Sequence, residues 1–138
     1  MLLLDASVWI DLLRGNDNGS VRYAMLREPV EDLALTPMTY LEVLQGARSD
    51  KEFSRMSGLL QAYVLLEPSH GLGTHEAAAR MYMTARRRGI TIRTAVDCLI
   101  AAVAIEHGAV LVHNDRDFLA LQAVDDRLQL YPPASLSH

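Results

Sequence analysis

Residues 109–118 read AVLVHNDRDF, and this stretch decides the predicted fold. Its first four residues form a short unbroken apolar run, which is typical of a parallel strand buried on both faces of a sheet. Polar and acidic residues follow at once, among them Asp115. At the start of the chain, Leu2–Leu4 followed by Asp5 repeats the pattern. We therefore predict two buried strands, each followed closely by an aspartate.

Strand and helix patterns alternate along the rest of the chain. Three further apolar runs predict strands at Leu33–Leu35, Tyr63–Leu66 and, as a final edge strand, Leu128–Tyr131. Apolar residues at helical spacing predict helices over Val8–Leu13, Val21–Arg27 (stopped by Pro29), Thr39 to about Arg48, 50–62, His75–Arg88 and Thr94 to Gly108. Such alternation indicates an α/β fold with a parallel sheet. The length fits one domain, which we take to span residues 1–138.

Several polar residues stand where they would cap these helices. Ser7 precedes the first helix. Thr39 with Glu42, and Thr94 with Asp97, match the capping box, in which the acid lies three residues after the cap. Capping and compensation of the helix dipole stabilise a helix by on the order of 0.3 to 1 kcal/mol. Taken alone, Glu42 and Asp97 are therefore better explained by capping than by chemistry.

Four acids are nevertheless predicted to meet at one edge of the sheet. Asp5 and Asp115 follow strands, while Glu42 and Asp97 begin helices. These are the positions that border the ligand crevice at the carboxyl ends of parallel strands. Taken alone, Asp5 would cap a helix and Asp115 would be a turn residue. Together, their carboxylates suit one or two Mg²⁺ or Mn²⁺ ions. Two ions roughly 4 Å apart activate water and stabilise the leaving oxygen in phosphodiester hydrolysis.

Composition narrows the class of protein. The formal net charge of −4 argues against a broad basic surface for nucleic acid, so a phosphate-bearing substrate would need local help. Bound metal or the run Arg86–Arg88 would supply that help, although a run of arginines is usually a solvated face. The single cysteine, Cys98, has no disulfide partner and is expected in the core. No stretch approaches the roughly 20 apolar residues of a membrane span, and we expect a cytoplasmic protein.

Four segments resemble the motifs of PIN domains, and together they span nearly the whole chain. Leu2–Asp11 and Thr39–Gly46 are similar to the first two motifs, and Asp97–Ala102 and His113–Phe118 are similar to the last two. The nearest subgroup is the VapC toxins of bacterial toxin–antitoxin pairs. Each motif alone is weak, but four in the right order within 138 residues are specific.

The resemblance implies a three-layer α/β/α PIN-like domain with a central, mainly parallel sheet. It also implies an endoribonuclease that depends on Mg²⁺ or Mn²⁺, hydrolyses RNA, forms a homodimer and is inhibited by a cognate VapB-type antitoxin. Carried over by motif, Asp5 and Asp97 are the principal metal ligands. Glu42 and Asp115 complete the acidic pocket, and Asp117 would bind a second ion or cap the next helix.

Five other residues have two interpretations each. Ser7 stands where the family often has Thr or Ser, so it would hydrogen-bond an acid or cap a helix. His113 would contact the substrate as a base, or would pack and bond the backbone. Arg116 lies between two acids and would reach a phosphate or neutralise its neighbours. Trp9 and Tyr82 are expected in the core or at a dimer contact rather than beneath nucleic-acid bases.

Other classes of protein compete with this interpretation. A haloacid dehalogenase phosphatase needs a second aspartate where this chain has Ser7. A receiver domain needs an acid pair after its first strand and a late lysine, whereas the only lysine here is Lys51. A PIN-fold binding module without catalysis is opposed by the presence of all four acids. Structure-specific DNA nucleases of this fold usually carry large insertions, for which 138 residues leave no room.

Overall fold

Five short strands form one parallel sheet. The structure is a computed structural model that describes residues 1–26 and 32–133. The strands lie in the order β3-β2-β1-β4-β5, and each neighbouring pair is parallel. Their bounds are β1 Leu2–Leu4, β2 Leu33–Leu35, β3 Val64–Leu65, β4 Val110–Val112 and β5 Gln129–Tyr131. The predicted α/β class is confirmed, with edge strands at β3 and β5.

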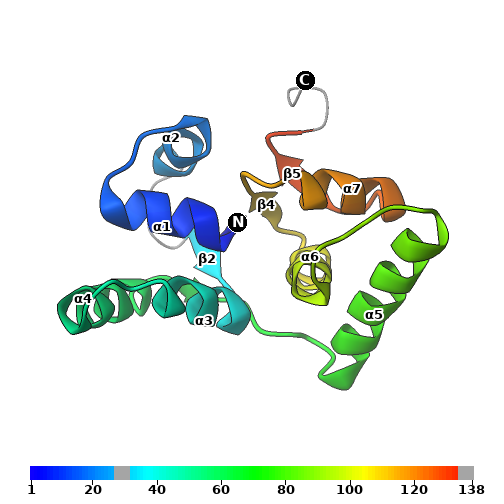
Figure 1. The fold of residues 1–138 in the computed structure, drawn as a ribbon, viewed down its shortest axis with the longest axis horizontal. Coiled ribbons are helices and arrows are strands. Elements are labelled where there is room, and N and C mark those ends of the chain that lie inside the picture. The colour runs from blue at the N-terminus through cyan, green and yellow to red at the C-terminus, as the bar shows by residue number, and fades with distance from the viewer. Residues whose placement is uncertain (27–31, 134–138) are drawn as a thin grey trace.

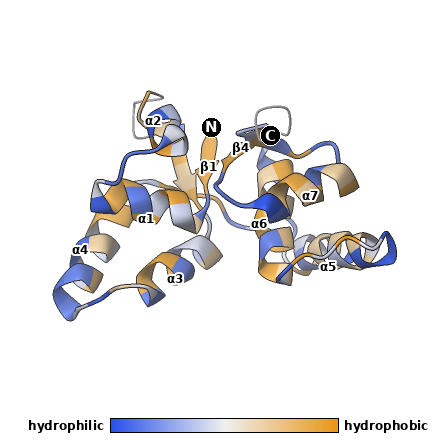
Figure 2. Ribbon diagram, turned by 45° about the horizontal axis from the view of Figure 1, so that its top comes forward, coloured by the Kyte–Doolittle hydropathy of each residue, from blue (hydrophilic) through white to orange (hydrophobic). Residues whose placement is uncertain are grey.

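Helices cover both faces of this sheet (Figure 1). On one face lie α1 Ala6–Arg14, α2 Gly19–Met25, α3 Pro37–Gln45 and α4 Asp50–Leu60, and on the other α5 Leu72–Arg87, α6 Ala95–His107 and α7 Arg116–Val124. Leu2 and Leu4 pack with the first group and Leu3 with the second, because successive side chains of a strand point to opposite faces. In Figure 2, β1 and β4 carry the hydrophobic colour between the two groups. The three-layer α/β/α arrangement is confirmed.

Small side chains allow α6 to be buried along most of its length. Ala101 and Ala104 are fully buried, and α6 packs against both α5 and α7. Thr94 caps the helix, since its Oγ1 accepts from the Val96 N–H at 3.2 Å. Gly108, with a φ of 62°, ends it in the left-handed conformation that glycine adopts most easily. Both predicted ends of this helix are confirmed.

The predicted start of α3 is wrong. The helix begins at Pro37 and is capped by Thr36, whose Oγ1 accepts from the Thr39 N–H at 3.0 Å. Proline is favoured at the first position of a helix, where its missing N–H would have no partner anyway. Glu42 therefore lies in the second turn and has no capping role in α3. This removes the structural explanation that competed with a chemical role for Glu42.

Two other helix starts differ from the prediction. α1 begins at Ala6, with Asp5 rather than Ser7 at its cap position. α5 begins at Leu72 rather than His75, because the chain turns into the helix directly after Gly71.

The helix predicted over Val21–Arg27 corresponds to α2, which begins two residues earlier at Gly19. Asn18 caps it, accepting from the Val21 N–H at 2.9 Å. Arg27 and Pro29 lie outside the described residues. Within residues 1–26 and 32–133, no helix combines the length and the apolar character needed to cross a membrane.

Candidate active site

The central strands β1 and β4 flank the switch point of the sheet, where the chain leaves neighbouring strands in opposite directions. The chain leaves β1 through α1 on one face of the sheet and leaves β4 through α7 on the other face. A parallel sheet opens a crevice at such a switch point. Asp5 follows β1 directly, and its N–H donates to the Val112 carbonyl at 2.9 Å. Asp115 follows β4, so the two strands bring these two acids to the same edge.

Three carboxylates meet at this edge. Asp97 lies in the first turn of α6, Asp115 caps α7, and Asp117 lies in the first turn of α7. One carboxylate oxygen of each lies within 4.8 Å of the others. Among the residues that the structure describes, no other group of three or more His, Cys, Asp or Glu residues is as close. Asp97, Asp115 and Asp117 are termed the acid cluster below.

Asp97 is the buried member of the acid cluster. It is only 7% exposed, and its Oδ2 is buried without a hydrogen-bond partner. Burial, a hydrogen bond with the Asp117 side chain, and the charges of Asp5, Asp115 and Asp117 raise the pKa of Asp97 to about 7. A buried carboxylate oxygen without a donor is costly unless a cation or another partner satisfies it.

Asp5 and Glu42 border the acid cluster without belonging to it. Burial is the main cause that raises the pKa of Asp5, and the charge of Asp115 adds to it. Burial also raises the pKa of Glu42, as does the charge of Asp5, and Glu42 Oε1 is buried without a partner. Asp5 is therefore coupled electrostatically to each of the other three predicted acids, including Asp97.

Arg93, which the sequence analysis did not single out, is bound to the acid cluster. Its NH2 group is paired with Asp115 Oδ2. Its Nε and its backbone N–H both donate to Asp117 Oδ2, at 3.3 Å and 3.0 Å. Arg116, which was predicted to neutralise these acids or reach a phosphate, is exposed and forms no ion pair in the described part of the chain. The ion pairs with Asp115 and Asp117 come instead from Arg93, which the loop before α6 brings to the two acids.

His113 packs in the core and bonds the backbone. It is 2% exposed, and its ring meets Phe118 edge-on at 5.7 Å between centroids. Its Nε2 donates to the Pro132 carbonyl at 3.0 Å, and its Nδ1 accepts from the Asp115 N–H at 3.1 Å. Burial lowers the pKa of His113, which favours the neutral ring. With both nitrogens engaged, His113 orients the backbone of Asp115 rather than serving as a base.

Ser7 and Trp9 have structural roles beside the site. The Ser7 hydroxyl donates to Asp5 Oδ2 at 3.4 Å, so the hydrogen-bonding interpretation is confirmed and the capping one is wrong. Trp9 is fully buried, and its Nε1 donates to the Ala34 carbonyl at 3.3 Å. The core interpretation of Trp9 is therefore confirmed.

The remaining candidates lie away from the acid cluster. Tyr82 is half-buried on α5, and the Arg86 guanidinium lies 5.8 Å from its ring centroid. The run Arg86–Arg88 is exposed, as expected of a solvated face, and Arg88 donates to the Ala123 carbonyl at 3.1 Å. Cys98 is a buried free thiol, as predicted.

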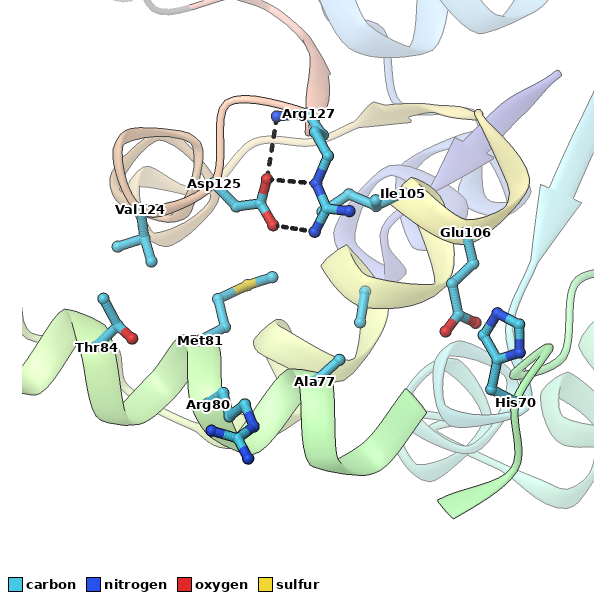
Figure 3. A pocket seen from close by; sticks show the side chains of 11 residues that line it. His70, Ala77, Arg80, Met81, Thr84, Ile105, Glu106, Val124, Asp125 and Arg127 are labelled. Atoms are coloured by element: carbon cyan, nitrogen blue, oxygen red, sulfur yellow. Dashed lines mark hydrogen bonds and ion pairs between the residues drawn. The ribbon is translucent and has the colours of Figure 1, made fainter. Parts of the chain in front are cut away.

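A cavity of about 500 Å³ lies near the C-terminal end of α6 (Figure 3). Met81 and Ile105 contribute apolar surface to it. At its rim Arg127 NH2 donates to Asp125 Oδ2 at 2.7 Å, as the dashed lines in Figure 3 mark. Asp97 lies at the opposite, N-terminal end of α6. The cavity is thus separate from the acid cluster.

The acid cluster fits a divalent cation. Mg²⁺ and Mn²⁺ prefer carboxylate oxygens, and Asp97 Oδ2 is such an oxygen with no competing hydrogen bond. A cation would also relieve the repulsion that contributes to the raised pKa of Asp97. Arg93 brings one positive charge to three acids, so the cluster keeps an excess of negative charge. Carboxylates arranged in this way are typical of metal-dependent enzymes that act on phosphate esters.

Comparison with known proteins identifies the family. The PIN domain family matches residues 2–124. Ribonuclease VapC11 of Mycobacterium tuberculosis is 36% identical over 122 residues, which cover 86% of this chain and 89% of the relative. Ribonuclease VapC51 of the same species is 36% identical over 126 residues, covering 88% of this chain and 85% of the relative. The chain therefore belongs to the PIN domain family, and within it to the VapC group.

Solved structures have the same fold. A chain of FitAB, solved bound to the IR36 DNA fragment, aligns with a TM-score of 0.72 at 25% identity, covering 94% of this chain and 93% of that chain. A chain of VapBC2 from Rickettsia felis, solved bound to a DNA fragment from its promoter, aligns with a TM-score of 0.73 at 16% identity. That alignment covers 94% of this chain and 96% of that chain.

Proposed function

We propose that this protein is an endoribonuclease that requires Mg²⁺ or Mn²⁺ and acts as the toxin of a VapBC-type pair, with one PIN domain over residues 1–138. The observation that carries the proposal is the buried, unpartnered Oδ2 of Asp97 within the acid cluster. It stands at the switch point of the sheet, in a chain 36% identical to proteins named as VapC ribonucleases. Since the substrate is RNA, we expect the protein to act in the cytoplasm.

Asp5, Glu42, Asp97 and Asp115 are the proposed catalytic residues. Asp97 and Asp115 would hold the ion within the acid cluster, and Asp117 would contribute its nearby oxygen. Asp5 would complete the ligand set from the end of β1. Glu42, on α3, would lie on another side of the ion with its unpartnered Oε1. The ion supplies positive charge that polarises the scissile phosphate and acidifies a bound water.

The chain's own residues then hold the reacting groups and move protons. The raised pKa of Glu42 leaves its Oε1 suited to accept the proton of an attacking water. The water oxygen bonds to phosphorus, the bond to the leaving oxygen breaks, and that oxygen takes up a proton. His113 is not available as the base, because the Pro132 carbonyl and the Asp115 N–H occupy its two nitrogens. Its contribution is to keep Asp115 in place.

A VapB-type antitoxin and a second copy of the chain are the proposed partners. Similar solved structures include a chain of a toxin–antitoxin complex from Klebsiella pneumoniae and a chain of VapBC-1 from nontypeable Haemophilus influenzae. These support a paired antitoxin for this chain by likeness of fold. The homodimer is proposed from membership of the VapC group alone.

Cleavage assays with the purified protein test the proposal. RNA is incubated with wild type in Mg²⁺, in Mn²⁺ and in EDTA, and in parallel with Asp5→Asn and Asp97→Asn. We expect cleavage only with a divalent ion and loss of activity in both variants. Asp126→Asn is the matched control, because Asp126 is an exposed acid outside the cluster. Full cleavage in EDTA would refute the metal requirement.

The same assay separates the alternatives. A single-stranded and a flap-bearing DNA replace RNA in further reactions. Cleavage of DNA alone would favour a structure-specific DNA nuclease. A protein that cleaves neither nucleic acid but binds its antitoxin would be a non-catalytic PIN-fold module.

A further inference from the structure

Arg93 lies on the solvent side of the acid cluster. Its side chain is 71% exposed, whereas those of its partners Asp115 and Asp117 are 22% and 13% exposed. Asp97 lies beneath them, 7% exposed. A group that approaches the cluster from solvent therefore meets the Arg93 guanidinium before it reaches the carboxylates.

The backbone of Arg93 is held in place, while its side chain is largely exposed to solvent. Ile92 is 4% exposed and anchors the loop in the core, and Thr94 caps α6. The Arg93 N–H donates to Asp117 Oδ2 at 3.0 Å. A guanidinium has five N–H donors, and the pairs with Asp115 and Asp117 use two of them in the described chain. The exposed guanidinium therefore keeps N–H donors for a further acceptor, while the backbone of Arg93 stays in place.

RNA would face an unfavourable charge at this site. The chain carries a formal net charge of −4, and Asp5 and Glu42 add to the three acids of the cluster. A phosphate beside these acids is attracted more strongly when a cation outside the cluster adds to a divalent ion among the carboxylates. Arg93 is the cation already ion-paired at the cluster. Guanidinium groups match phosphate geometry with two parallel N–H donors.

We propose that Arg93 is a substrate-binding residue whose guanidinium passes from Asp115 and Asp117 to a backbone phosphate of the RNA when the carboxylates take up a divalent ion. The proposal rests on the RNA substrate of the proposed function. The Arg93 guanidinium supplies positive charge to Asp115 and Asp117. The same carboxylates would hold the ion, and the Arg93 side chain would then be released to bind the incoming phosphate.

Arg116 is a matched control for Arg93. It is exposed, it lies between Asp115 and Asp117 in the chain, and it makes no ion pair within the described residues. Arg116→Gln removes one positive charge from the same surface without touching the cluster's hydrogen bonds. Any general electrostatic effect on RNA binding is therefore seen in both variants, and a specific contact only in Arg93→Gln.

Two measurements on the whole chain test the proposal. Calorimetric titration with Mn²⁺, without RNA, gives the ion affinity of wild type, Arg93→Gln, Arg93→Lys and Arg116→Gln. Anisotropy of a labelled mixed-sequence single-stranded RNA, read in Mn²⁺ before cleavage proceeds and at several KCl concentrations, gives RNA affinity and its salt dependence. We expect Arg93→Gln to bind Mn²⁺ at least as tightly as wild type, because a competing cation is gone.

RNA binding is expected to respond in the opposite sense. Arg93→Gln should bind RNA about tenfold more weakly, since a charge-assisted bond is lost. The slope of log affinity against log salt should fall by about 0.7, as for one lost phosphate contact on a single strand. Arg93→Lys should recover part of the RNA affinity, because lysine keeps the positive charge but lacks the paired N–H donors of the guanidinium. Arg116→Gln should change RNA affinity by no more than about twofold.

Two results would overturn the proposal. If Arg93→Gln bound RNA as tightly as wild type, Arg93 would be only a counter-ion for the acids. If Mn²⁺ affinity fell in parallel with RNA affinity, Arg93 would maintain the ion site instead of contacting substrate. A wild type that binds RNA in Mn²⁺ but never cleaves it would refute the proposed nuclease activity and leave the binding role of Arg93 intact.

Discussion

Thr94 caps α6 without help from the carboxylate of Asp97, three residues further on. The Thr94 hydroxyl accepts from the Val96 N–H at 3.2 Å, while Asp97 Oδ2 is buried without a partner. The two residues match a capping box in sequence, yet in the described chain no hydrogen bond joins the Asp97 side chain to the Thr94 N–H. We therefore expect the buried charge of Asp97 to lower the stability of the protein when no cation is bound.

Thermal melts of Asp97→Asn test this relationship. At a Mg²⁺ concentration about 100 times the dissociation constant, wild type should gain ~2.7 kcal/mol, a rise of several degrees in Tm. Asp97→Asn should lose most of that rise. In EDTA the variant should be at least as stable as wild type, because one repelling charge is removed at constant side-chain size. An equal loss of stability in both buffers would mean that Asp97 is only a helix residue.

The pH dependence of the same pair gives an independent check. Folding raises the pKa of Asp97 from 3.8 to about 7, so the folded state holds this proton more tightly than the unfolded chain. The resulting stability is complete below pH 3.8 and is lost as the pH rises through about 7. In EDTA, the advantage of Asp97→Asn over wild type should thus be larger at pH 8 than at pH 5. Asp126→Asn, at an exposed acid outside the cluster, is the control.

The order and type of the elements follow from the sequence for physical reasons. Short apolar runs such as Leu2–Leu4 are too short for helices, and burial on both faces makes them uniformly apolar. The start of α3 was misplaced because Thr39 and Glu42 matched a cap, whereas the preceding Thr36 and Pro37 are the stronger signal. A cap depends on backbone angles, which spacing alone does not determine.

The candidate site was predictable only in part. Asp97 and Asp115 stand out because each lies next to a recognisable strand or helix start. Asp117 and Arg93 belong to the site because the loop before α6 packs against the start of α7. That contact joins segments distant in sequence, and no local pattern marks it. Likewise, Arg116 was considered as a partner of these acids because it lies between them in sequence, whereas in the structure Arg93 lies next to them.

His113→Phe should affect stability more than chemistry. Phenylalanine keeps most of the ring volume but leaves the Pro132 carbonyl and the Asp115 N–H unpartnered, which costs about 1–3 kcal/mol for each buried group. Urea unfolding measures this loss. Cleavage per folded molecule should keep the pH profile of wild type, since His113 stays neutral. A fall of roughly a hundredfold or more, with unchanged stability, would indicate a general base instead.

Expression in a bacterial host should arrest growth. Wild-type protein induced without an antitoxin is expected to stop the rise in optical density, because uncontrolled cleavage of RNA blocks protein synthesis. Asp97→Asn should allow normal growth at equal soluble level, and Asp126→Asn should behave like wild type. Unimpaired growth with abundant soluble wild type would contradict the toxin function while leaving nuclease activity to the purified assay.

Glu52 provides a test of pH-dependent stability far from the acid cluster. Its Oε1 accepts from the Arg14 side chain at 3.0 Å and from the Arg48 N–H at 2.9 Å, so it joins α1 to the start of α4. Hydrogen bonds from the Arg48 side chain and backbone, and then from Arg14, lower the pKa of Glu52 from 4.5 to about 2. A lowered pKa means that the unfolded chain binds the proton more readily than the folded one.

The sign and the pH window of the Glu52 effect follow from this shift. The contribution of Glu52 to stability is fully present above pH 4.5 and is lost as the pH falls toward about 2. The Tm of wild type should therefore exceed that of Glu52→Gln by a constant amount at neutral pH, and the difference should shrink steadily between pH 4.5 and 2. Comparing the two proteins cancels the other carboxylates, which titrate in both. Glu76→Gln is the control, because Glu76 is exposed on α5 and makes no ion pair among the described residues. If the gap between wild type and Glu52→Gln stayed constant down to pH 3, the ion pairs of Glu52 would contribute nothing to folding.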